Sequence, residues 1–301
     1  MRNKLEITVC KDYDGRDVYC VLKHKLSVGE TQIRRAKKHI GSILLNGEPV
    51  FTNHTVKAGD VVTFRINNNS NSDNIIPCEG ELDIVYEDDD VLILNKPAGL
   101  ATHPSAHHYQ KSLAGMIMNY YQKQNKSFVF RCINRLDVGT SGLTVIAKHA
   151  YAQRILSNQL HTDSFIREYT AVVHGITDKE GFVSAPIRRA EGSIIKRCIA
   201  PDGADAYTQF RRTATVNDMS ILSLRLKTGR THQIRVHMSH IGHPLVGDDL
   251  YGICTNLVKR HALHSSYISF VQPVTGERIE FSSDLPDDIT RLIKAYEGFS
   301  L

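Results

Sequence analysis

The sequence of 301 residues lacks the features of membrane and secreted proteins. No stretch approaches the ~20 consecutive apolar residues that a membrane-spanning helix needs. The first residues, MRNKLEITVCKDYDG, lack the apolar core of a secretory signal peptide. We therefore expect a cytoplasmic protein. Its length allows one large domain or two smaller ones.

Cysteine is sparse, and its spacing excludes two common uses. The six cysteines are Cys10, Cys20, Cys78, Cys132, Cys198 and Cys254. None belongs to a C-x-x-C pair, which argues against a zinc ribbon and against the disulfide framework of a secreted domain. We expect reduced thiols with structural roles.

Net charge is absent from most of the chain. Residues 71–301 hold 25 Lys and Arg against 25 Asp and Glu, whereas residues 1–70 hold 12 against 7. The whole excess of +5 therefore lies in the first quarter. A small basic module joined to a neutral body suggests attachment to a polyanion. The alternative is a solvated basic face without a partner.

The basic part has a recognisable order of elements. TQIRRAKKHI, residues 31–40, predicts a helix with Ile33, Ala36, Lys37 and Ile40 on one side, ended by Gly41. Its charged residues are Arg34, Arg35, Lys37 and Lys38. Asn46-Gly47 predicts a tight hairpin turn, and a further strand follows Gly59-Asp60.

This order resembles the alpha-L RNA-binding domain of a ribosomal small-subunit protein and several RNA-modifying enzymes. The resemblance implies that Arg34, Arg35, Lys37 and Lys38 contact RNA. INNNSNSDNIIPCEG has the composition of a linker. We expect an RNA-binding domain at 1–66, a linker at 67–80 and a second domain at 81–301.

The second domain opens with a predicted β-hairpin at 82–104, whose turn contains Glu87-Asp88-Asp89-Asp90. Adjacent carboxylates suggest a divalent metal site. Consecutive residues of a strand point in different directions, however. We therefore favour a solvated turn.

Strands and helices then follow in mixed order. LTVIAK at 143–148 predicts a half-buried strand, 149–160 a helix, and 167–175 and 221–230 two further strands. THQIRVHMSHIGHP fits a helix at 231–241 that Gly242 and Pro244 end. Strands separated both by short turns and by helices predict a mixed α+β domain.

The segment INRLDVGTSGL, residues 133–143, surrounds one carboxylate, Asp137, with turn-forming residues. Gly139 and Gly142 allow sharp turns, and Thr140 and Ser141 are able to hydrogen-bond local backbone. Such a loop holds an acid at the edge of a cleft. The alternative for a single loop aspartate is a turn or capping role.

Two other segments supply candidate partners for Asp137. Tyr169 lies in a predicted strand, and Arg235 lies near the start of the 231–241 helix, beside Arg230. An acid, a phenol and a guanidinium suit acid–base or nucleophilic chemistry without a metal.

Four histidines crowd one segment and raise the question of zinc. They are His232, His237, His240 and His243. The segment has no H-E-x-x-H pattern and no acid, so we favour structural or RNA-facing roles over a zinc site.

Four motifs together carry a family resemblance. VYEDDDVLILNKPAGLATHP, RLDVGTSGL, REYTAVVHG and LKTGRTHQIRVHMSHIGHPLVGDDLYG resemble, in order and spacing, the RluA family of pseudouridine synthases. The resemblance implies a mixed, mostly antiparallel sheet with flanking helices and a central cleft. It also implies an isomerase that needs no metal and no organic cofactor.

The resemblance assigns roles to residues of this chain. Asp137 matches the essential aspartate, and Arg235 the basic residue that pairs with it. Tyr169 matches the tyrosine that stacks on the target base and is a candidate general base. Arg135 matches the arginine that enters the RNA stack, with Arg230 and His232 as further RNA contacts. Asn134 departs from the family, which usually has histidine there.

The expected partner is RNA. Large-subunit ribosomal RNA is the family's commonest target, tRNA is second, and we expect a monomer. Two other functions stay open: an RNA-binding or ribosome-assembly factor that has lost catalysis, and a hydrolase that excises a base.

Overall fold

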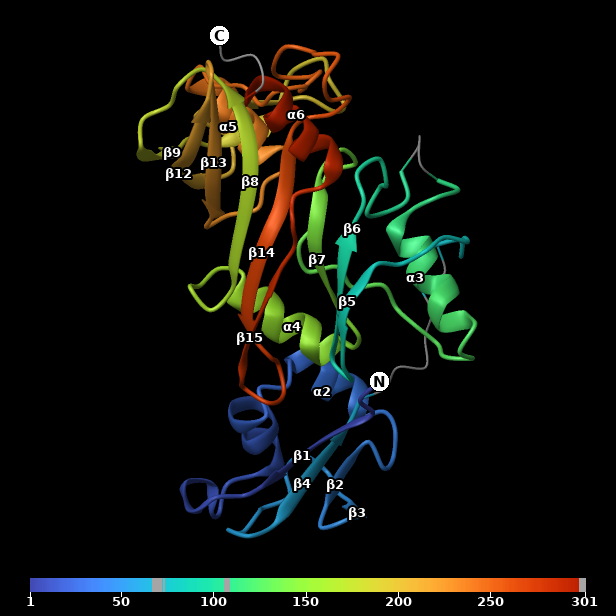
Figure 1. The fold of residues 1–301 in the computed structure, drawn as a ribbon. Helices are drawn as coiled ribbons and strands as arrows, with labels where there is room; N and C mark the ends of the chain where they lie inside the picture. Colours follow the sequence, from blue (N-terminus) through green and yellow to red (C-terminus); the bar gives the residue numbers. More distant parts are fainter. Residues whose placement is uncertain (67–71, 73, 106–108, 298–301) are drawn as a thin grey trace.

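The computed structural model describes residues 1–66, 72, 74–105 and 109–297. A small four-stranded sheet lies at one end of the molecule and a large sheet occupies the rest (Figure 1). Residues 67–71 and 73 of the expected linker lie outside the described residues.

The N-terminal sheet has the order β1-β4-β2-β3. Its strands are β1 (Lys4–Thr8), β2 (Ile43–Leu45), β3 (Glu48–Pro49) and β4 (Val61–Arg65). Its helical segments are η1 (Lys11–Tyr13), α1 (Val18–Cys20), η2 (Val21–Lys25) and α2 (Glu30–Ala36). These elements enclose a hydrophobic core of their own, with Leu22, Ile33 and Val62 buried in it.

The local predictions for this module hold in part. Asn46 and Gly47 join β2 to β3 with φ angles of 53° and 88°, the left-handed pair expected of a tight hairpin. The helix predicted at 31–40 is wrong at its end. It stops at Ala36, and residues beyond it form turns that reverse the chain into β2. Ile40, expected on the apolar side, is 99% exposed.

The large sheet has the order β5-β6-β7-β14-β8-β13-β12-β9, and β15 also pairs with β14. Every pairing in it is antiparallel except β7 with β14. The strands are β5 (Ile84–Glu87), β6 (Val91–Lys96), β7 (Ser141–Ala147), β8 (Ile166–His174), β9 (Glu180–Ser184), β12 (Tyr207–Val216), β13 (Met219–Leu226), β14 (Leu263–Val271) and β15 (Arg278–Ser282). β10 (Ile187–Arg189) and β11 (Arg197–Ile199) form a separate pair.

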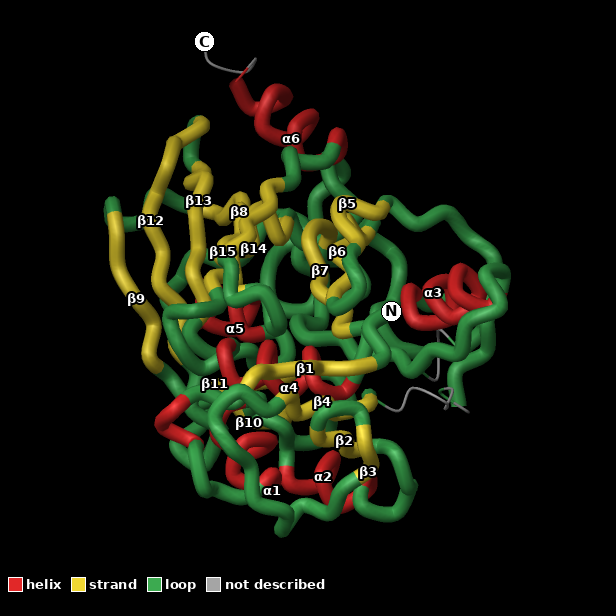
Figure 2. The backbone as a smooth tube through the Cα atoms, turned by 90° about the horizontal axis from the view of Figure 1, so that it is seen from below, coloured by secondary structure: helices red, strands yellow, loops and turns green. Residues whose placement is uncertain are grey.

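In the described part of the chain, four helices accompany the large sheet. They are α3 (Leu113–Gln122), α4 (Ala150–Gln159), α5 (Gln233–His240) and α6 (Asp287–Glu297). Figures 1 and 2 show α3 beside β5 and β6 and α5 on the side of β12 and β13. The mixed, mostly antiparallel sheet with flanking helices is the predicted α+β class. Within the described ranges, no helix is both long and apolar enough to cross a membrane.

Strand β7 is more deeply buried than its sequence suggests. The prediction was a half-buried strand, yet every residue of β7 is buried. Ile146 packs into the hydrophobic cluster around α3, and Val145 packs into the cluster around α4. Helices therefore cover both faces of the sheet at β7. The loop that carries Asp137 leads directly into this buried strand.

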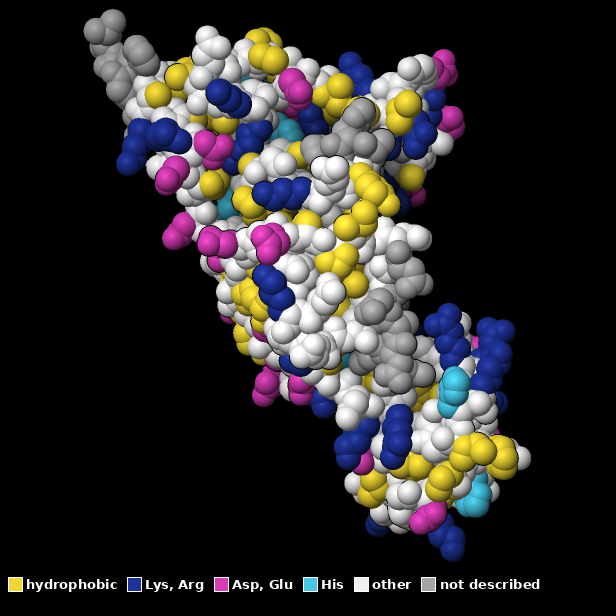
Figure 3. All heavy atoms as spheres, turned by 90° about the vertical axis from the view of Figure 1, so that its right-hand side faces the viewer, with side chains coloured by type: hydrophobic (Ala, Val, Ile, Leu, Met, Phe, Trp, Pro, Cys, Tyr) yellow, Lys and Arg dark blue, Asp and Glu magenta, His cyan; other side chains and the backbone are white. Residues whose placement is uncertain are grey.

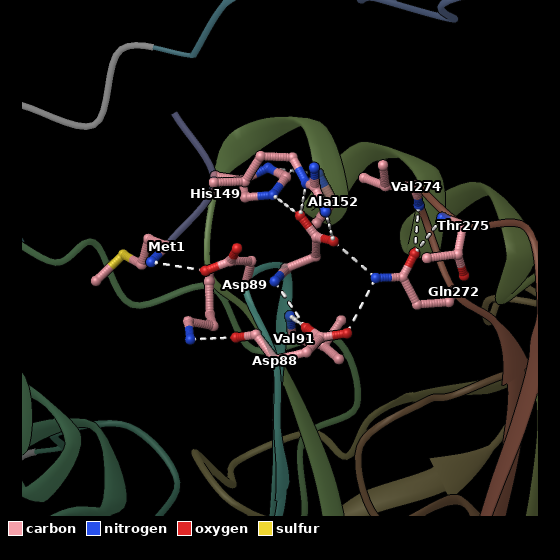
Figure 4. Close-up of polar contacts among 12 residues, drawn as sticks. Met1, Asp88, Asp89, Val91, His149, Ala152, Gln272, Val274 and Thr275 are labelled. Atoms are coloured by element: carbon pink, nitrogen blue, oxygen red, sulfur yellow. Dashed lines mark hydrogen bonds and ion pairs between the residues drawn. The ribbon is translucent and has the colours of Figure 1, made fainter. Parts of the chain in front are cut away.

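The acidic turn between β5 and β6 is not a solvated turn throughout. Asp90 is 1% exposed and accepts hydrogen bonds from Arg2 at 2.6 Å and Gln272 at 2.7 Å. His149, at the start of α4, lies 2.8 Å from the same carboxylate. Figure 4 shows His149 and Gln272 directed towards this turn from either side. These partners are distant in sequence, so the local pattern cannot reveal them.

Helix α4 joins the two parts of the molecule. Tyr151 and Ile155 on its first turns pack against the core of the N-terminal module. Leu160 and His161, at its other end, line a cleft of the second domain. One short helix therefore connects the basic module to the cleft.

Candidate active site

A cleft of about 600 Å³ opens beside β8 and the start of α5. Asp137, Tyr169 and Arg235, which three separate segments contribute, all line it. Arg135, Arg230 and His232 line it as well. All six cleft residues selected from the sequence therefore meet in one place.

The loop bearing Asp137 is a compact turn at the start of β7. The Thr140 amide donates to the Asp137 carbonyl oxygen at 3.0 Å, which closes the turn. Gly142 has φ +108°, and a side chain there would meet the Ser265 carbonyl oxygen at 2.3 Å. Glycine is thus required at 142, because β14 passes so close to β7. The Asp137 side chain remains 27% exposed towards the cleft.

The side chains after Asp137 bond to distant residues instead of to the local backbone that we expected. Thr140 Oγ1 lies 2.9 Å from His261 Nε2, and Ser141 Oγ lies 2.9 Å from His264 Nδ1. Gly139 makes room for the His261 ring, since a Cβ at 139 would lie 2.7 Å from it. Residues just before and at the start of β14 therefore hold the loop in place on its side away from the cleft.

Arg260 strengthens the same attachment. Its Nη1 donates to the Gly139 carbonyl oxygen at 2.9 Å, and its Nη2 donates to Ser141 Oγ at 3.2 Å. Asp288, at the start of α6, binds the guanidinium at 2.7 and 2.9 Å. A charged pair thus connects the candidate catalytic loop to the last helix.

Asn134 has a clear structural role. It is 3% exposed, donates to the Leu143 carbonyl oxygen at 3.1 Å and accepts from the Val145 amide at 2.8 Å. The amide both donates and accepts, so it serves two groups of β7, and the Leu143 carbonyl oxygen also accepts from Ser265 Oγ at 3.0 Å. A neutral amide serves this buried position without the cost of a charge.

Tyr169 is buried in the wall of the cleft. It is 5% exposed and packs with Leu136, Leu224 and Leu263. Burial raises the pKa of its phenol above the ordinary value. The phenol therefore keeps its proton near neutral pH, and its ring is fixed by the surrounding leucines.

Arg235 contacts Asp137 only at long range. Its Nη1 lies 3.9 Å from Asp137 Oδ2, whereas its Nε and Nη2 each donate to Asp248 at 2.7 Å. Asp248 is fully buried. Although burial opposes ionisation, the hydrogen bonds from Arg235 hold the pKa of Asp248 below its ordinary value. The expected partnership with Asp137 is present, but Asp248 is the residue that fixes the guanidinium.

His232 stands between the cleft and Tyr251. Its Nδ1 lies 2.9 Å from the Tyr251 hydroxyl and its Nε2 lies 4.0 Å from Asp137 Oδ2. Its φ of 58° is left-handed, which turns the chain into α5. Burial lowers the pKa of His232, so the imidazole is largely neutral at neutral pH.

The other histidines of this segment turn to different neighbours. His237 contacts Thr208 Oγ1 at 2.9 Å, His243 contacts the His174 carbonyl oxygen at 2.9 Å, and His240 is exposed. In the part of the chain that the structure describes, no three His, Cys, Asp or Glu side chains gather in a way that would hold a metal ion.

The remaining cations selected from the sequence are exposed. Arg135 and Arg230 lie at the rim of the cleft. The four exposed cations of the module are Arg34, Arg35, Lys37 and Lys38. Figure 3 shows Lys and Arg side chains over the surface of this module, at the lower end of the view.

The sequence reasoning missed several residues that shape the cleft. Asp248 fixes the guanidinium of Arg235, and Arg260 and His261 hold the loop that carries Asp137. No local pattern identifies them, because their partners lie elsewhere in the chain. Arg167 also lines the cleft. The sequence could have identified Arg167, because side chains alternate along a strand and residues two apart, such as Arg167 and Tyr169, share a face.

Comparison with known proteins gives consistent matches. A family model described as RNA pseudouridylate synthase matches residues 90–240, which include Asp137, Tyr169 and Arg235. An uncharacterized RNA pseudouridine synthase, YjbO of Bacillus subtilis, is 42% identical over 84% of this chain and 90% of its own length. The ribosomal large subunit pseudouridine synthase D of Xanthomonas campestris pv. campestris is 36% identical over 85% of this chain and 81% of its own.

A solved structure shares the fold. Human RNA pseudouridylate synthase domain containing 4 superimposes with a TM-score of 0.57 at 19% identity, and the match covers 71% of this chain and 92% of the human one.

Proposed function

Because the chain belongs to the RNA pseudouridylate synthase family and is an isomerase of that class, we propose that it converts specific uridines of large-subunit ribosomal RNA to pseudouridine. The observation that carries the proposal is the meeting of Asp137, Tyr169 and Arg235 in one cleft. The choice of RNA rests on the name of the Xanthomonas relative, with tRNA as the second candidate.

The reaction needs a nucleotide that has left the RNA stack. Flipping costs a few kcal/mol. Arg135 is exposed at the rim, beside the loop of Asp137. In our proposal its planar guanidinium fills the gap and recovers part of the stacking.

Inside the cleft, we assign each side chain a role. The ring of Tyr169 stacks on the uracil, and its phenol is a candidate general base. Asp137 acts at the sugar, as nucleophile or as proton acceptor, while the glycosidic bond breaks and the base rotates. Arg235, fixed by Asp248, keeps a positive charge 3.9 Å from the Asp137 carboxylate.

The N-terminal module serves binding in this proposal. Its order of elements resembles that of an alpha-L domain, which supports this role, and its cations Arg34, Arg35, Lys37 and Lys38 are exposed. Phosphate contacts of this kind give affinity without sequence preference. Arg230 and His232 are further candidates for contacts to RNA near the cleft.

The test uses RNA labelled in uridine. Incubation with the protein is expected to give pseudouridine with no free base. Asp137→Asn is expected to abolish the product and to leave RNA binding intact, whereas Asp163→Asn, on a carboxylate that is 94% exposed, should stay active. Unchanged RNA with every candidate substrate would indicate an assembly factor, and released uracil would indicate a hydrolase.

A further inference from the structure

Arg167 is a buried arginine in the cleft that has no part in the proposed roles of Asp137, Tyr169 and Arg235. It lies on β8, two residues before Tyr169, so the two side chains share a face of the sheet. It lines the same cleft as Asp137 and is 5% exposed.

The guanidinium of Arg167 is almost unpartnered. Its one hydrogen bond within the described ranges runs from Nη2 to the Leu226 carbonyl oxygen, at 3.4 Å. Its Nε is buried without an acceptor, and no carboxylate of the described residues lies within ion-pair distance. Burial lowers its pKa from the ordinary value. A buried cation without a counter-ion is costly to the folded state.

Arg235 is an arginine of the same cleft whose guanidinium has its hydrogen-bond acceptors. It is equally buried, at 5% exposure, but the two carboxylate oxygens of Asp248 each accept from it at 2.7 Å. Arg167 lacks any equivalent partner in the described chain. A carbonyl oxygen of a molecule that enters the cleft is therefore a suitable acceptor for this guanidinium.

The depth of Arg167 favours the base over the backbone of the RNA. At the rim, Arg135 is exposed towards the RNA stack, and the exposed Arg230 is placed for phosphates, which stay on the outside of a flipped nucleotide. Arg167 is buried beside Tyr169, and the base is the part of a nucleotide that enters such a site.

Uracil gains negative charge during the reaction. When the C1′–N1 bond breaks, its electron pair stays with the base and spreads over N1, O2 and O4. When C5 then bonds to C1′, the base donates an electron pair to that bond. C5 afterwards loses its proton and N1, which no longer bonds to the sugar, gains one, so a neutral uracil ring results. Atoms and electrons balance without any further reagent.

We propose that Arg167 is a catalytic residue that donates hydrogen bonds to a carbonyl oxygen of the flipped uracil and stabilises the charge on the severed base. This inference rests on the proposed function. A fixed donor aimed at developing charge acts on the rate more than on binding.

The test compares the full-length wild type with Arg167→Met, Arg167→Lys and a control, Arg225→Gln. Arg225 lies on the neighbouring β13, opposite Glu168, pairs with Asp163 and is 39% exposed. Three quantities are measured: the single-turnover rate of pseudouridine formation, the RNA affinity with its salt dependence, and the thermal midpoint of unfolding.

Arg167→Met is expected to lower the rate by about 100-fold, the usual effect of losing one such donor. RNA affinity should be unchanged, and the thermal midpoint should be equal or higher because an unpaired buried charge has gone. Arg225→Gln should match the wild type in rate.

Arg167→Lys gives a readout specific to charge. A buried lysine has a depressed pKa, so this variant should lose activity as pH rises through a range where the wild type stays active. It also retains a cation of similar reach if Arg167→Met fails to fold.

Three results would overturn the inference. They are an unchanged rate, a thermal midpoint that falls together with the rate, and weaker RNA affinity with a smaller salt slope at an unchanged rate, which would assign Arg167 to a phosphate. Failure of the wild type to isomerise any uridine would instead contradict the proposed function.

Discussion

At the scale of single residues, the orientation of Arg235 depends on one buried carboxylate. Asp248→Asn removes the charge that accepts two hydrogen bonds from this guanidinium. Leaving a buried cation without its partner is expected to cost about 3 kcal/mol of the free energy of unfolding. Denaturant titration of the two proteins measures this difference.

Asp249→Asn is the matched control. It removes a carboxylate 3.6 Å from the same guanidinium, but Asp249 is 81% exposed. Water screens this contact, so the free energy of unfolding should change by less than about 0.5 kcal/mol. Equal effects of the two substitutions would contradict the assignment of Asp248 as the residue that fixes Arg235.

His261 makes the loop of Asp137 sensitive to acid. Burial lowers its pKa from 6.5 to about 3, so between these values the unfolded chain binds a proton that the folded protein does not. Stability from this residue is complete above the unfolded pKa and is lost as pH falls towards about 3.

The measurement is urea unfolding of wild type and His261→Gln at pH about 7 and about 5. Glutamine retains a hydrogen-bonding group near Thr140 but does not titrate. The wild type should lose more stability than the variant over this step. Parallel losses in the two proteins would show that His261 does not titrate in this way.

At the scale of elements, the loop at 133–143 and strand β7 form one unit. Asn134→Ala removes the side-chain acceptor of the Val145 amide and one of two side-chain hydrogen bonds to the Leu143 carbonyl oxygen, which also accepts from Ser265 Oγ at 3.0 Å. At about 1–3 kcal/mol for a buried group that loses its partner, the expected loss in the free energy of unfolding is about 1–3 kcal/mol.

Asn95→Ala on the adjacent β6 is the comparison. Its amide donates to Asp83 in an exposed position and its side-chain carbonyl oxygen accepts from Ser283 Oγ at 3.1 Å. Both contacts lie where water is able to replace the missing partner, so the loss should stay below about 1 kcal/mol. If Asn134→Ala were as mild as Asn95→Ala, Asn134 would not be what secures the loop.

Periodicity and turn chemistry were sufficient to predict many elements. The Asn46-Gly47 hairpin, the α4 and α5 helices and β8 all follow from local patterns. The burial of β7 on both faces did not, because covering helices are a property of the assembled fold. The burial of Asp90 was not predicted for the same reason, since its partner Gln272 lies 182 residues away.

Some residues of the candidate site could be predicted from the sequence and others could not. Asp137, Tyr169 and Arg235 stand in motifs, so a family resemblance selects them from the sequence alone. Asp248 and Asp249 are adjacent acids that sequence does not distinguish, yet one is buried and the other is exposed. Burial depends on the packing of the turn after α5, which no local pattern encodes.

At the scale of the whole molecule, the basic module is held at one end of α4 and the cleft is at the other. Changing Arg34, Arg35, Lys37 and Lys38 together to glutamine keeps this arrangement, unlike deletion of residues 1–70, which would expose Tyr151. RNA affinity should fall, and the salt slope should decrease by up to about 0.9 for each phosphate that the variant no longer neutralises.

Glutamine at Lys11 and Lys57, exposed cations of the same module outside the α2 segment, serves as the control and should have a smaller effect. Affinity and salt slope that stay at wild-type values in the fourfold variant would contradict an RNA-binding role for this surface.

The most direct test maps pseudouridines in large-subunit ribosomal RNA from cells that lack the gene. One or more pseudouridines should be missing, should return when wild-type protein is supplied, and should stay missing with Asp137→Asn. An unchanged map in the deletion strain would contradict ribosomal RNA as the target. Restoration by Asp137→Asn would contradict Asp137 as the residue that acts on the sugar.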